Sequence, residues 1–400
     1  MSILTPVPLR RLKYAATINY EALGEDTDPD YVLQYVDIGN VDSSGVIHEI
    51  VEYRFADAPS RARRRVRDGD VIISCVRTYL QAIASIKEPP DNLIVSTGFA
   101  VVRPQTDVFD PAFGKYALRE MRFLAEVEKR SVGVSYPAIN ASDLANISIH
   151  LPHIQQQRTI ADYLDRETSR IDALIAAKGL LLDLLAEKCR ALITCTVTRG
   201  LDPNFPMCDS GIPWIDRIPM HWNILKLKQI ASLKSGEFIT ADSISDEGEY
   251  PVFGGNGLRG YTTAYTHNGD HILIGRQGAL CGNINYASGR FWASEHAVVV
   301  TVNKGHEVRW LGKLLEIMNL NQYSQSAAQP GLAVEFIANL SLPVPPDLEQ
   351  RAIVSFIQDA MGRIDAIVAG TKQTIELLKE RRTALITAAV TGQTDIGGIA

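Results

Sequence analysis

The pattern of apolar and polar positions predicts two long helices, over residues 157–198 and 350–391. In both segments apolar or small residues recur at alternating steps of three and four, which forms a narrow apolar seam along one helix face, as in a coiled coil. Each segment is about three times as long as the ~12-residue helix of an ordinary core, which favours a scaffold role. The seam positions are Ala161, Leu164, Thr168, Ile171, Ile175, Leu182, Leu185, Cys189 and Leu192, then Val354, Ile357, Met361, Ile364, Val368, Thr371, Ile375, Leu378, Arg382 and Leu385.

The two segments are copies of each other. QRTIADYLDRETSRIDALI and the later ALITCTVT match QRAIVSFIQDAMGRIDAIV and ALITAAVT without a gap, displaced by 193 positions. Arg158 therefore matches Arg351, and the register continues upstream, where Pro152 matches Pro345. A period of nearly half the chain predicts a duplicated two-part unit rather than a solenoid.

The first copy has a wider apolar stripe than a two-helix seam needs. Leu174, Leu181 and Leu184 lie beside the seam, so this helix is expected to have more than one neighbour. Gly179 is expected to mark a joint, because glycine is costly inside a helix. In the second copy, Asp347 with Gln350 resembles a capping box.

A strand-rich globular segment precedes each long helix. We call residues 1–154 the first head and residues 223–346 the second head. A Gly-Asp turn precedes an apolar strand in both, at positions 69–70 and 269–270, and STGFAVV (96–102) corresponds to SEHAVVV (294–300). The duplication therefore covers the whole chain, and the heads have diverged more than the helices. The predicted divisions are 1–154, 155–199 (long helix), 200–222 (connector), 223–346, 347–392 (long helix) and 393–400 (tail).

Composition excludes several classes of protein. The chain is 46% hydrophobic, enough for packed cores, but no run of eighteen apolar residues suggests a membrane span, and the N-terminus lacks the apolar region of a signal peptide. Five scattered cysteines without a CxxC pair predict free thiols in a reducing cytoplasm and no metal site. The net charge of −6 argues against indiscriminate nucleic-acid binding, although a local basic face is compatible with it.

The known catalytic motifs are not supported. Residues 255–260 fit GxGxxG, but the β-favouring YTTAYT follows, whereas a dinucleotide site needs a helix there. This stretch is predicted to be a tight, backbone-exposing loop. No P-loop, HExxH or GxSxG occurs, so neither a catalytic residue nor a bound cofactor is predicted.

Two clusters are candidates for DNA contact. Arginine forks suit phosphate oxygens and the guanine edge, and glutamine suits adenine. The first head carries an arginine-rich stretch, and the second carries polar residues on glycine-rich turns. The candidates are Arg54, Arg61, Arg63, Arg64, Arg65, Arg67 and Arg77, then Gly255, Asn256, Arg259, Tyr261, Arg276 and Gln277.

Four features carry a family resemblance: the duplicated QR…RIDALI…ALIT-VT helices, the connector SGIPWIDRIPMHW (210–222), and the stretches YPVFGGNGLRGY and GDHILIGRQGALCG. Together they resemble the specificity subunit of type I restriction–modification enzymes. The resemblance covers nearly the whole chain. The first head lacks the GGNG loop, which weakens the transfer of individual residues there.

The resemblance implies an α+β architecture. Two globular α/β target-recognition domains would be joined by two long antiparallel, coiled-coil-like helices with pseudo-two-fold internal duplication. Each head would read one half of a split site in double-stranded DNA, and the helices would set the spacing and dock two methyltransferase subunits. S-adenosylmethionine would be bound by those subunits, restriction subunits could join, and the chain itself would be non-catalytic.

Two alternatives remain at this point. One is a stand-alone DNA-acting enzyme with an unrecognised site. The other is a coiled-coil adaptor without a role in nucleic-acid binding.

Overall fold

The computed structural model describes residues 7–278, 280–324 and 331–394. The chain divides into two compact units: unit 1 is formed by residues 1–178 and 372–400, and unit 2 by residues 179–371. Each unit therefore takes about half of each long helix together with one head.

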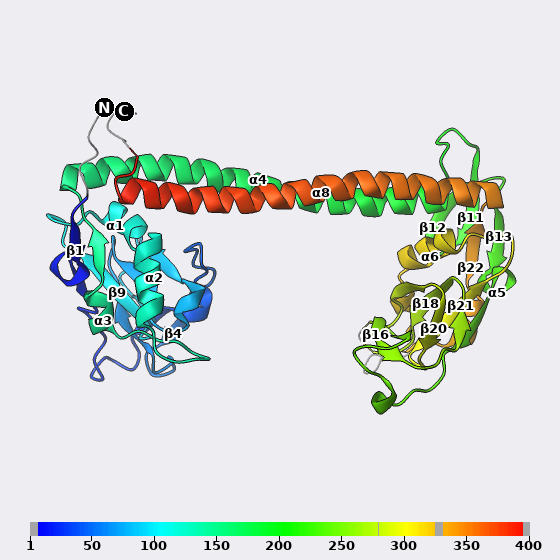
Figure 1. Cartoon of the computed structure of the whole chain (residues 1–400), viewed down its shortest axis with the longest axis horizontal. Coiled ribbons are helices and arrows are strands. Elements are labelled where there is room, and N and C mark those ends of the chain that lie inside the picture. The colour runs from blue at the N-terminus through cyan, green and yellow to red at the C-terminus, as the bar shows by residue number, and fades with distance from the viewer. Residues whose placement is uncertain (1–6, 279, 325–330, 395–400) are drawn as a thin grey trace. The chain divides into compact units, whose positions relative to one another are not determined.

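The first head contains two four-stranded sheets and a short ribbon (Figure 1). One sheet has the order β2-β9-β6-β7 and is antiparallel throughout. The other has the order β4-β3-β8-β5, in which β3 and β8 are parallel, and β1 pairs with β10. The strands are β1 (Leu9–Arg11), β2 (Ala16–Ile18), β3 (Val32–Val36), β4 (Val51–Arg54), β5 (Ala62–Arg65), β6 (Val71–Ser74), β7 (Ile83–Ser85), β8 (Leu93–Ser96), β9 (Phe99–Pro104) and β10 (Ser148–His150).

Helices cover one face of the β2-β9-β6-β7 sheet. They are α1 (Pro111–Ala117), α2 (Met121–Arg130) and α3 (Ala141–Ala145), and short 3-10 turns lie at Leu12–Tyr14, Ile38–Asn40 and Thr78–Leu80. Phe113 on α1 belongs to the same buried cluster as Leu164 and Ile386 of the long helices. Helices α1 and α2 are separate because Glu120 caps a new helix by accepting from Arg122 N and Phe123 N.

The second head repeats this plan. Its sheets have the orders β14-β21-β18-β19 and β16-β15-β20-β17, and β13 pairs with β22. Again one pair, β15 with β20, is parallel. The strands are β13 (Asn223–Lys226), β14 (Ala231–Ser235), β15 (Tyr250–Gly254), β16 (Gly257–Thr262), β17 (His267–Asn268), β18 (His271–Gly275), β19 (Ile284–Ala287), β20 (Arg290–Ala293), β21 (Ala297–Val302) and β22 (Ser341–Val344).

Helices of unit 2 pack on the β14-β21-β18-β19 sheet. They are α5 (Leu227–Ile230), α6 (Val308–Ile317) and α7 (Val334–Ala338), with 3-10 turns at Ala241–Ser243 and Leu320–Tyr323. Trp310 of α6 is fully buried in one cluster with Val197 and Ile353 of the long helices. The connector (200–222) contains a hairpin of β11 (Met207–Ile212) and β12 (Ile215–Pro219).

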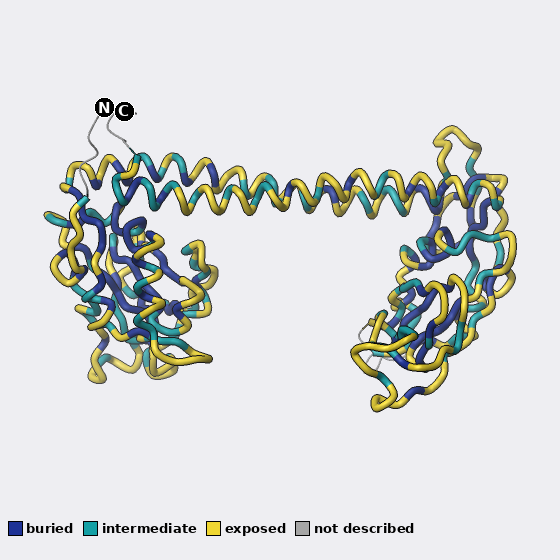
Figure 2. Tube along the Cα trace, viewed as in Figure 1, coloured by how far each residue is buried: buried dark blue, intermediate teal, exposed yellow. Residues whose placement is uncertain are grey.

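The long helices are α4 (Ile154–Arg199) and α8 (Asp347–Val390). Every predicted seam position is buried or half-buried, whereas Leu174, Leu181 and Leu184 are exposed. Buried or half-buried positions alternate with exposed ones along both long helices in Figure 2. The seam prediction is confirmed. Helix α4 continues through Gly179 without interruption.

One buried glutamine in each repeat anchors its helix to the adjoining head. Gln157 accepts from Asp110 N (2.8 Å) and donates to Val108 O and Pro152 O. Gln350, its repeat partner, accepts from Glu307 N (2.8 Å) and donates to Pro345 O. The expected capping box is therefore wrong: Gln350 is engaged elsewhere, and Asp347 is already the first helical residue.

Two further observations concern the described residues. None of their helices combines the length and apolarity that crossing a bilayer requires. All five cysteines are free thiols.

Candidate nucleic-acid interface

The arginine stretch of the first head forms β5, the edge strand of its sheet. Two of these arginines lie over aromatic rings: the Arg63 guanidinium carbon is 4.5 Å from the Phe55 ring centroid, and that of Arg65 is 6.0 Å from the Tyr31 centroid. Both side chains are half-buried. Arg63 Nη1 donates to Ala62 O at 3.0 Å. Stacking restricts each guanidinium without occupying its other N–H donors, so both remain suitable for phosphate oxygens.

Arg64 differs from its neighbours because part of its side chain is buried. Its Nε is buried and has no hydrogen-bond partner among the described residues. Burial raises the pKa of the Cys75 thiol to about 11, and the positive charge of Arg64 opposes that rise. Part of the Arg64 side chain is therefore buried near Cys75, although the residue as a whole is half-buried like Arg63 and Arg65.

Arg67 belongs to an ion-pair network. Its Nε donates to Glu21 Oε2 at 3.0 Å, while Arg103 bonds both Glu21 and the buried Asp70. Burial tends to raise the pKa of Glu21, but the two arginines outweigh it, and the pKa is lowered. Asp70 Oδ2 also accepts from the backbone N of Arg67 at 2.8 Å. The positive charge of Arg67 is thus largely balanced within the head.

The remaining arginines of the prediction lie outside β5. Arg54 ends β4 and is 3.6 Å from Asp30 in an exposed ion pair. Arg61 is exposed just before β5. Arg77 is exposed on the loop after β6, 4.8 Å from the Tyr136 ring centroid, and its backbone is left-handed, with φ +53°.

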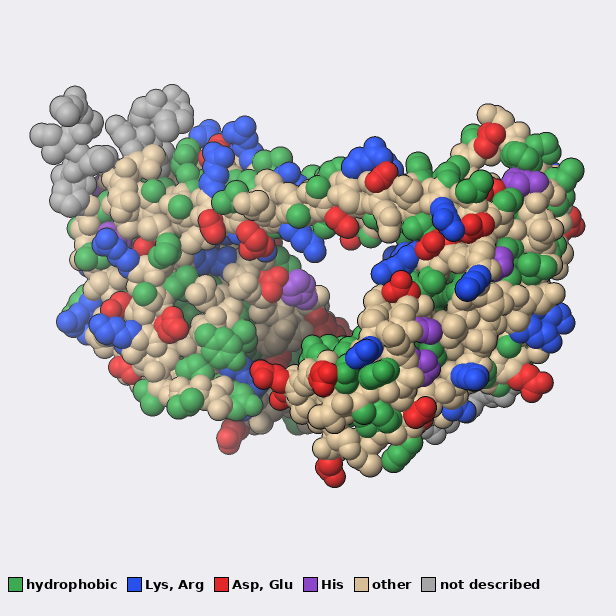
Figure 3. Space-filling view, turned by 45° about the vertical axis from the view of Figure 1, so that its right-hand side comes forward, with side chains coloured by type: hydrophobic (Ala, Val, Ile, Leu, Met, Phe, Trp, Pro, Cys, Tyr) green, Lys and Arg blue, Asp and Glu red, His purple; other side chains and the backbone are tan. Residues whose placement is uncertain are grey.

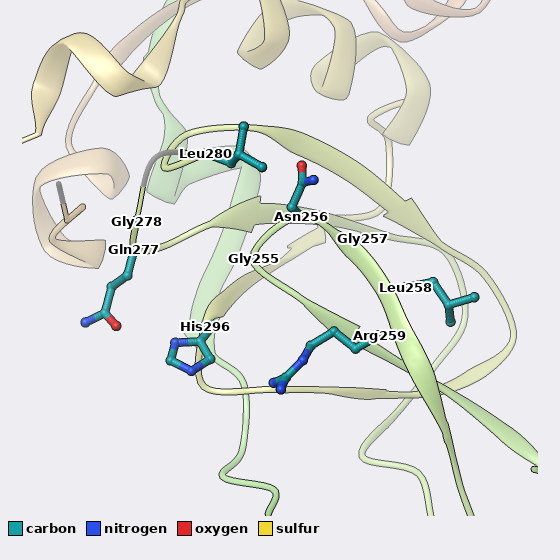
Figure 4. A pocket seen from close by; sticks show the side chains of 9 residues that line it. All are labelled: Gly255, Asn256, Gly257, Leu258, Arg259, Gln277, Gly278, Leu280 and His296. Atoms are coloured by element: carbon teal, nitrogen blue, oxygen red, sulfur yellow. The ribbon is translucent and has the colours of Figure 1, made fainter. Parts of the chain in front are cut away.

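In the second head, four of the six predicted residues meet around one hollow of about 580 Å³ (Figure 4). They are Gly255, Asn256, Arg259 and Gln277, and the other lining residues are Gly257, Leu258, Gly278, Leu280 and His296. The hairpin turn between β15 and β16 supplies one wall, and the loop after β18 supplies another. Of the GxGxxG stretch, only Gly255 and Asn256 form the hairpin turn, and residues 257–260 belong to β16. A strand rather than a helix follows the turn, and the predicted tight loop is limited to those two residues.

Two glycines permit these loops to approach each other. A Cβ on Gly255 would lie 3.0 Å from His296 O, and one on Gly275 would lie 2.3 Å from Gly255 O. Any larger side chain at 275 would push the loops apart, since such contacts are shorter than atoms tolerate. The hollow therefore depends on backbone packed against backbone, which exposes peptide groups beside the polar side chains.

The polar side chains around the hollow are only partly engaged. Asn283 Nδ2 donates to Asn256 Oδ1 at 2.9 Å, which fixes the amide of Asn256. The Arg259 side chain lies across Gly254, where a Cβ would come within 2.5 Å of Arg259 Cδ. In Figure 4 its guanidinium points toward the His296 ring.

Two predicted residues lie outside this hollow. Tyr261 is in β16, where its backbone exchanges hydrogen bonds with Ser245. Arg276 is half-buried, and its backbone bonds His296 O and Leu332 N. The backbones of both residues thus take part in the hydrogen bonds that hold β16 and the loop after β18 in place.

Sequence reasoning missed His296. Its Nε2 lies 3.2 Å from Glu295 Oε1, while Glu295 Oε2 is buried without a partner in the described chain. The motif SEHAVVV marked this turn as the counterpart of STGFAVV, but nothing in the motif indicated that the histidine faces a hollow.

Neither head presents a continuous basic surface in the view of Figure 3, where basic and acidic side chains are interspersed. Within the described residues, no group of three or more His, Cys, Asp or Glu side chains is placed to hold a metal ion. The candidate interface therefore consists of discrete polar and arginine groups on loops and one sheet edge.

Known proteins are similar to this chain in sequence. A family model described as "Type I restriction modification DNA specificity domain" matches residues 65–178 and 219–377. The EcoprrI type I restriction enzyme specificity subunit of Escherichia coli is 47% identical over 137 residues, which cover 33% of this chain and 34% of that protein. The putative MjaX specificity subunit of Methanocaldococcus jannaschii is 22% identical over 346 residues, or 80% of this chain and 78% of that protein.

Solved structures share the fold. A chain from a type I restriction–modification system, studied for complex assembly and conformational transition, aligns with a TM-score of 0.79 at 23% identity, covering 97% of this chain and 98% of its own. The HsdS subunit of Thermoanaerobacter tengcongensis aligns with a TM-score of 0.59 at 23% identity, covering 97% of both chains.

Proposed function

The chain belongs to the family of type I restriction–modification DNA specificity subunits, and from this premise we propose that it selects the DNA sequence on which a methylating complex acts. Members of this family are non-catalytic, and binding of S-adenosylmethionine belongs to their methyltransferase partners. The chain would thus supply recognition, and its partners would supply the chemistry.

The observation that best supports two-part recognition is the repeated sheet plan. Each unit contains an antiparallel sheet, a second sheet with one parallel pair, and a glutamine anchor to its long helix. The heads have the same plan but different exposed residues. We therefore propose that each head reads one half of a bipartite, asymmetric site in double-stranded DNA, as two unlike readers on related frames would.

The proposed contacts differ between the heads. In the first, exposed Arg61 and the stacked Arg63 and Arg65 would contact phosphates, which position a protein on DNA. In the second, Arg259 and Gln277 at the hollow would contact base edges. Smaller contributions are assigned to most of the remaining predicted residues: Arg54 and Arg67, which have acidic partners, Arg64, whose Nε is buried, and Gly255, Asn256, Tyr261 and Arg276.

The long helices would dock the partner subunits. Leucines beside the seam are exposed on α4, including Leu174 (52%) and Leu180 (60%), and Ile367 and Leu377 are exposed on α8. Apolar positions left open along an otherwise satisfied helix pair suit a partner helix. We propose two methyltransferase subunits as occupants, with restriction subunits joining them, in the cytoplasm where the host DNA is.

Mapping modified bases in host DNA tests the proposal directly. The chain should be expressed with its methyltransferase subunits, and the map compared with that from cells lacking the chain. We expect methylation at one bipartite sequence only when the chain is present. Methylation of the same sites without it, or cleavage or methylation by the purified chain alone, would contradict the proposal.

The spacing role has its own test. Four residues inserted at Gly179 and four at the matching Lys372 would lengthen the helices by about 6 Å. The gap between the methylated half-sites is expected to change by about two base pairs, at ~3.4 Å per step. An unchanged gap would show that the helices do not set it.

A further inference from the structure

The loop after β6 in the first head has the same backbone framework as the loop after β18 in the second. Residue 74 corresponds to 275, and the register continues to 82 and 283. Four backbone hydrogen bonds of the first head have a counterpart in the second. In the first head they are Ser74 N to Ala82 O (2.9 Å), Cys75 N to Gly98 O (2.8 Å), Leu80 N to Arg77 O (2.9 Å) and Ile139 N to Cys75 O (2.9 Å). Their counterparts, in the same order, are Gly275 N to Asn283 O (2.9 Å), Arg276 N to His296 O (2.9 Å), Cys281 N to Gly278 O (3.0 Å) and Leu332 N to Arg276 O (3.0 Å).

Both loops contain two left-handed residues at corresponding positions. In the second head these are Gly278 (φ +84°) and Gly282 (φ +88°), as expected for a conformation that lacks a steric penalty only in glycine. In the first head the same positions hold Arg77 (φ +53°) and Gln81 (φ +50°). Arginine and glutamine do not tolerate the left-handed region as glycine or asparagine does. The first head therefore retains two long polar side chains at positions where the backbone conformation is unfavourable for them.

The side chains of Arg77 and Gln81 make few contacts that would stabilise the fold. Arg77 and Gln81 are exposed, and within the described part of the chain the Gln81 side chain makes no hydrogen bond. The Arg77 guanidinium lies over the Tyr136 ring. Tyr79, between them, is 53% exposed. Non-glycine residues held in left-handed conformations concentrate at functional sites, where the side chain is needed in a fixed direction.

We propose that the loop from Arg77 to Gln81 is the base-reading element of the first head, and that Gln81 and Arg77 determine its sequence preference. Glutamine pairs with the adenine N6/N7 edge and arginine with the guanine O6/N7 edge. The arginines of β5 then position the head on the phosphates. This assignment rests on the proposed function and names the residues through which one head performs it.

Glycine substitutions provide a test that spares the fold. Arg77→Gly and Gln81→Gly install the residues that the second head has at these positions, and glycine fits the backbone better than the native side chains do. In the complex with methyltransferase subunits, the double variant is expected to keep its thermal stability. It should lose roughly tenfold to a hundredfold discrimination at one or two bases of one half-site, and keep the other half-site intact.

Two matched variants distinguish the outcomes. Gln81→Asn, which tolerates the left-handed backbone but is shorter, should relax the same base position. Arg63→Gln with Arg65→Gln should weaken binding to all sequences alike. An unchanged methylation motif in the glycine and asparagine variants would overturn the assignment while the proposed function stands. Absence of any motif in the unmodified complex would overturn both.

Discussion

The two heads have the same backbone plan, but the bulky and the small residues have exchanged places at their exposed loops. In the first head Ile38 lies over Gly98, where a Cβ would come within 2.1 Å of Ile38 Cδ1. In the second, His296 stands where Gly98 does, and Gly255 stands where Ile38 does, as the parallel strand pairs align them. The second head is therefore hollowed at this position, whereas the first carries a side chain there.

A second exchange involves the sheet edge. The arginine strand β5 has β17 as its counterpart, because each pairs with the inner strand of the parallel pair. Where the first head has stacked arginines, the second has His267 stacked on Phe291, with ring centroids 5.5 Å apart. The two heads therefore retain the same hydrogen-bonded frame, while side chains at corresponding positions differ in their chemistry.

The largest expected effect is on the free energy of unfolding, and it compares the two buried glutamine anchors, Gln157 and Gln350. Gln157→Ala should leave the buried N–H of Asp110 and two carbonyls without partners, which costs about 3 kcal/mol of unfolding free energy. Gln350→Ala should cost about the same in unit 2. All four tryptophans lie within residues 179–371, so fluorescence follows the unfolding of unit 2, and circular dichroism follows both units.

We expect the Gln157 variant to shift the part of the circular-dichroism transition that comes from unit 1, without moving the fluorescence midpoint of unit 2. The Gln350 variant is expected to move that fluorescence midpoint. The neighbouring Gln156 is exposed, and Gln156→Ala serves as the control with little effect. Equal shifts for the variant and the control would mean that the anchors do not hold the heads to their helices.

The next effect concerns the sheet edge of the first head. Arg63→Glu with Arg65→Glu should lower DNA affinity of the assembled complex by about a hundredfold near 0.1 M salt, since each lost phosphate contact removes ~0.9 from the salt slope. Arg54→Gln, whose native partner is Asp30, should change little. Binding measured against salt concentration checks both, and an unaltered slope would place the phosphate contacts elsewhere.

A smaller effect separates residues at the hollow from those beside it. Arg259→Ala and Gln277→Ala are each expected to reduce discrimination at one base by about 1–3 kcal/mol. Tyr261→Phe, outside the hollow, should leave the methylated sequence unchanged. Competition with duplexes altered one base pair at a time gives the measurement. Loss of preference in the Tyr261 variant alone would move the reading surface to β16.

The smallest expected effect is on the pH dependence of stability and concerns His267 in β17, the counterpart of β5. Burial, reinforced by the charge of His271, lowers the pKa of His267. The unfolded chain therefore binds a proton more readily than the folded one. The corresponding stability is present above the unfolded value of about 6.5 and is lost as the pH falls below it.

His267→Asn should flatten the pH dependence of the fluorescence-monitored midpoint between about pH 5 and 7. The exposed His153 lies in unit 1, and His153→Asn should leave that dependence as it was. A slope that survives in the His267 variant would assign the acid sensitivity of unit 2 to other groups.

Much of the architecture could be read from residue spacing. The alternation of three and four identified every seam position of α4 and α8, and the 193-residue repeat identified the duplication. These patterns are legible because a helix seam is periodic and its neighbours are close in sequence. The GGNG hairpin was recognisable for a similar reason, since glycine at tight turns has a local steric cause.

The interface depended on contacts that have no local signature. Five arginines within seven positions looked alike in the sequence, yet Arg64 has a buried Nε, Arg67 is balanced by Glu21, and Arg63 stacks on Phe55. Their partners are brought in by strand pairing over long separations. Gln81 gave no signal, because only the fold aligns it with Gly282 and reveals its left-handed backbone. The sequence determined the repeat and the helices through short-range periodicity, and the tertiary structure alone decided which side chains remain free to meet DNA.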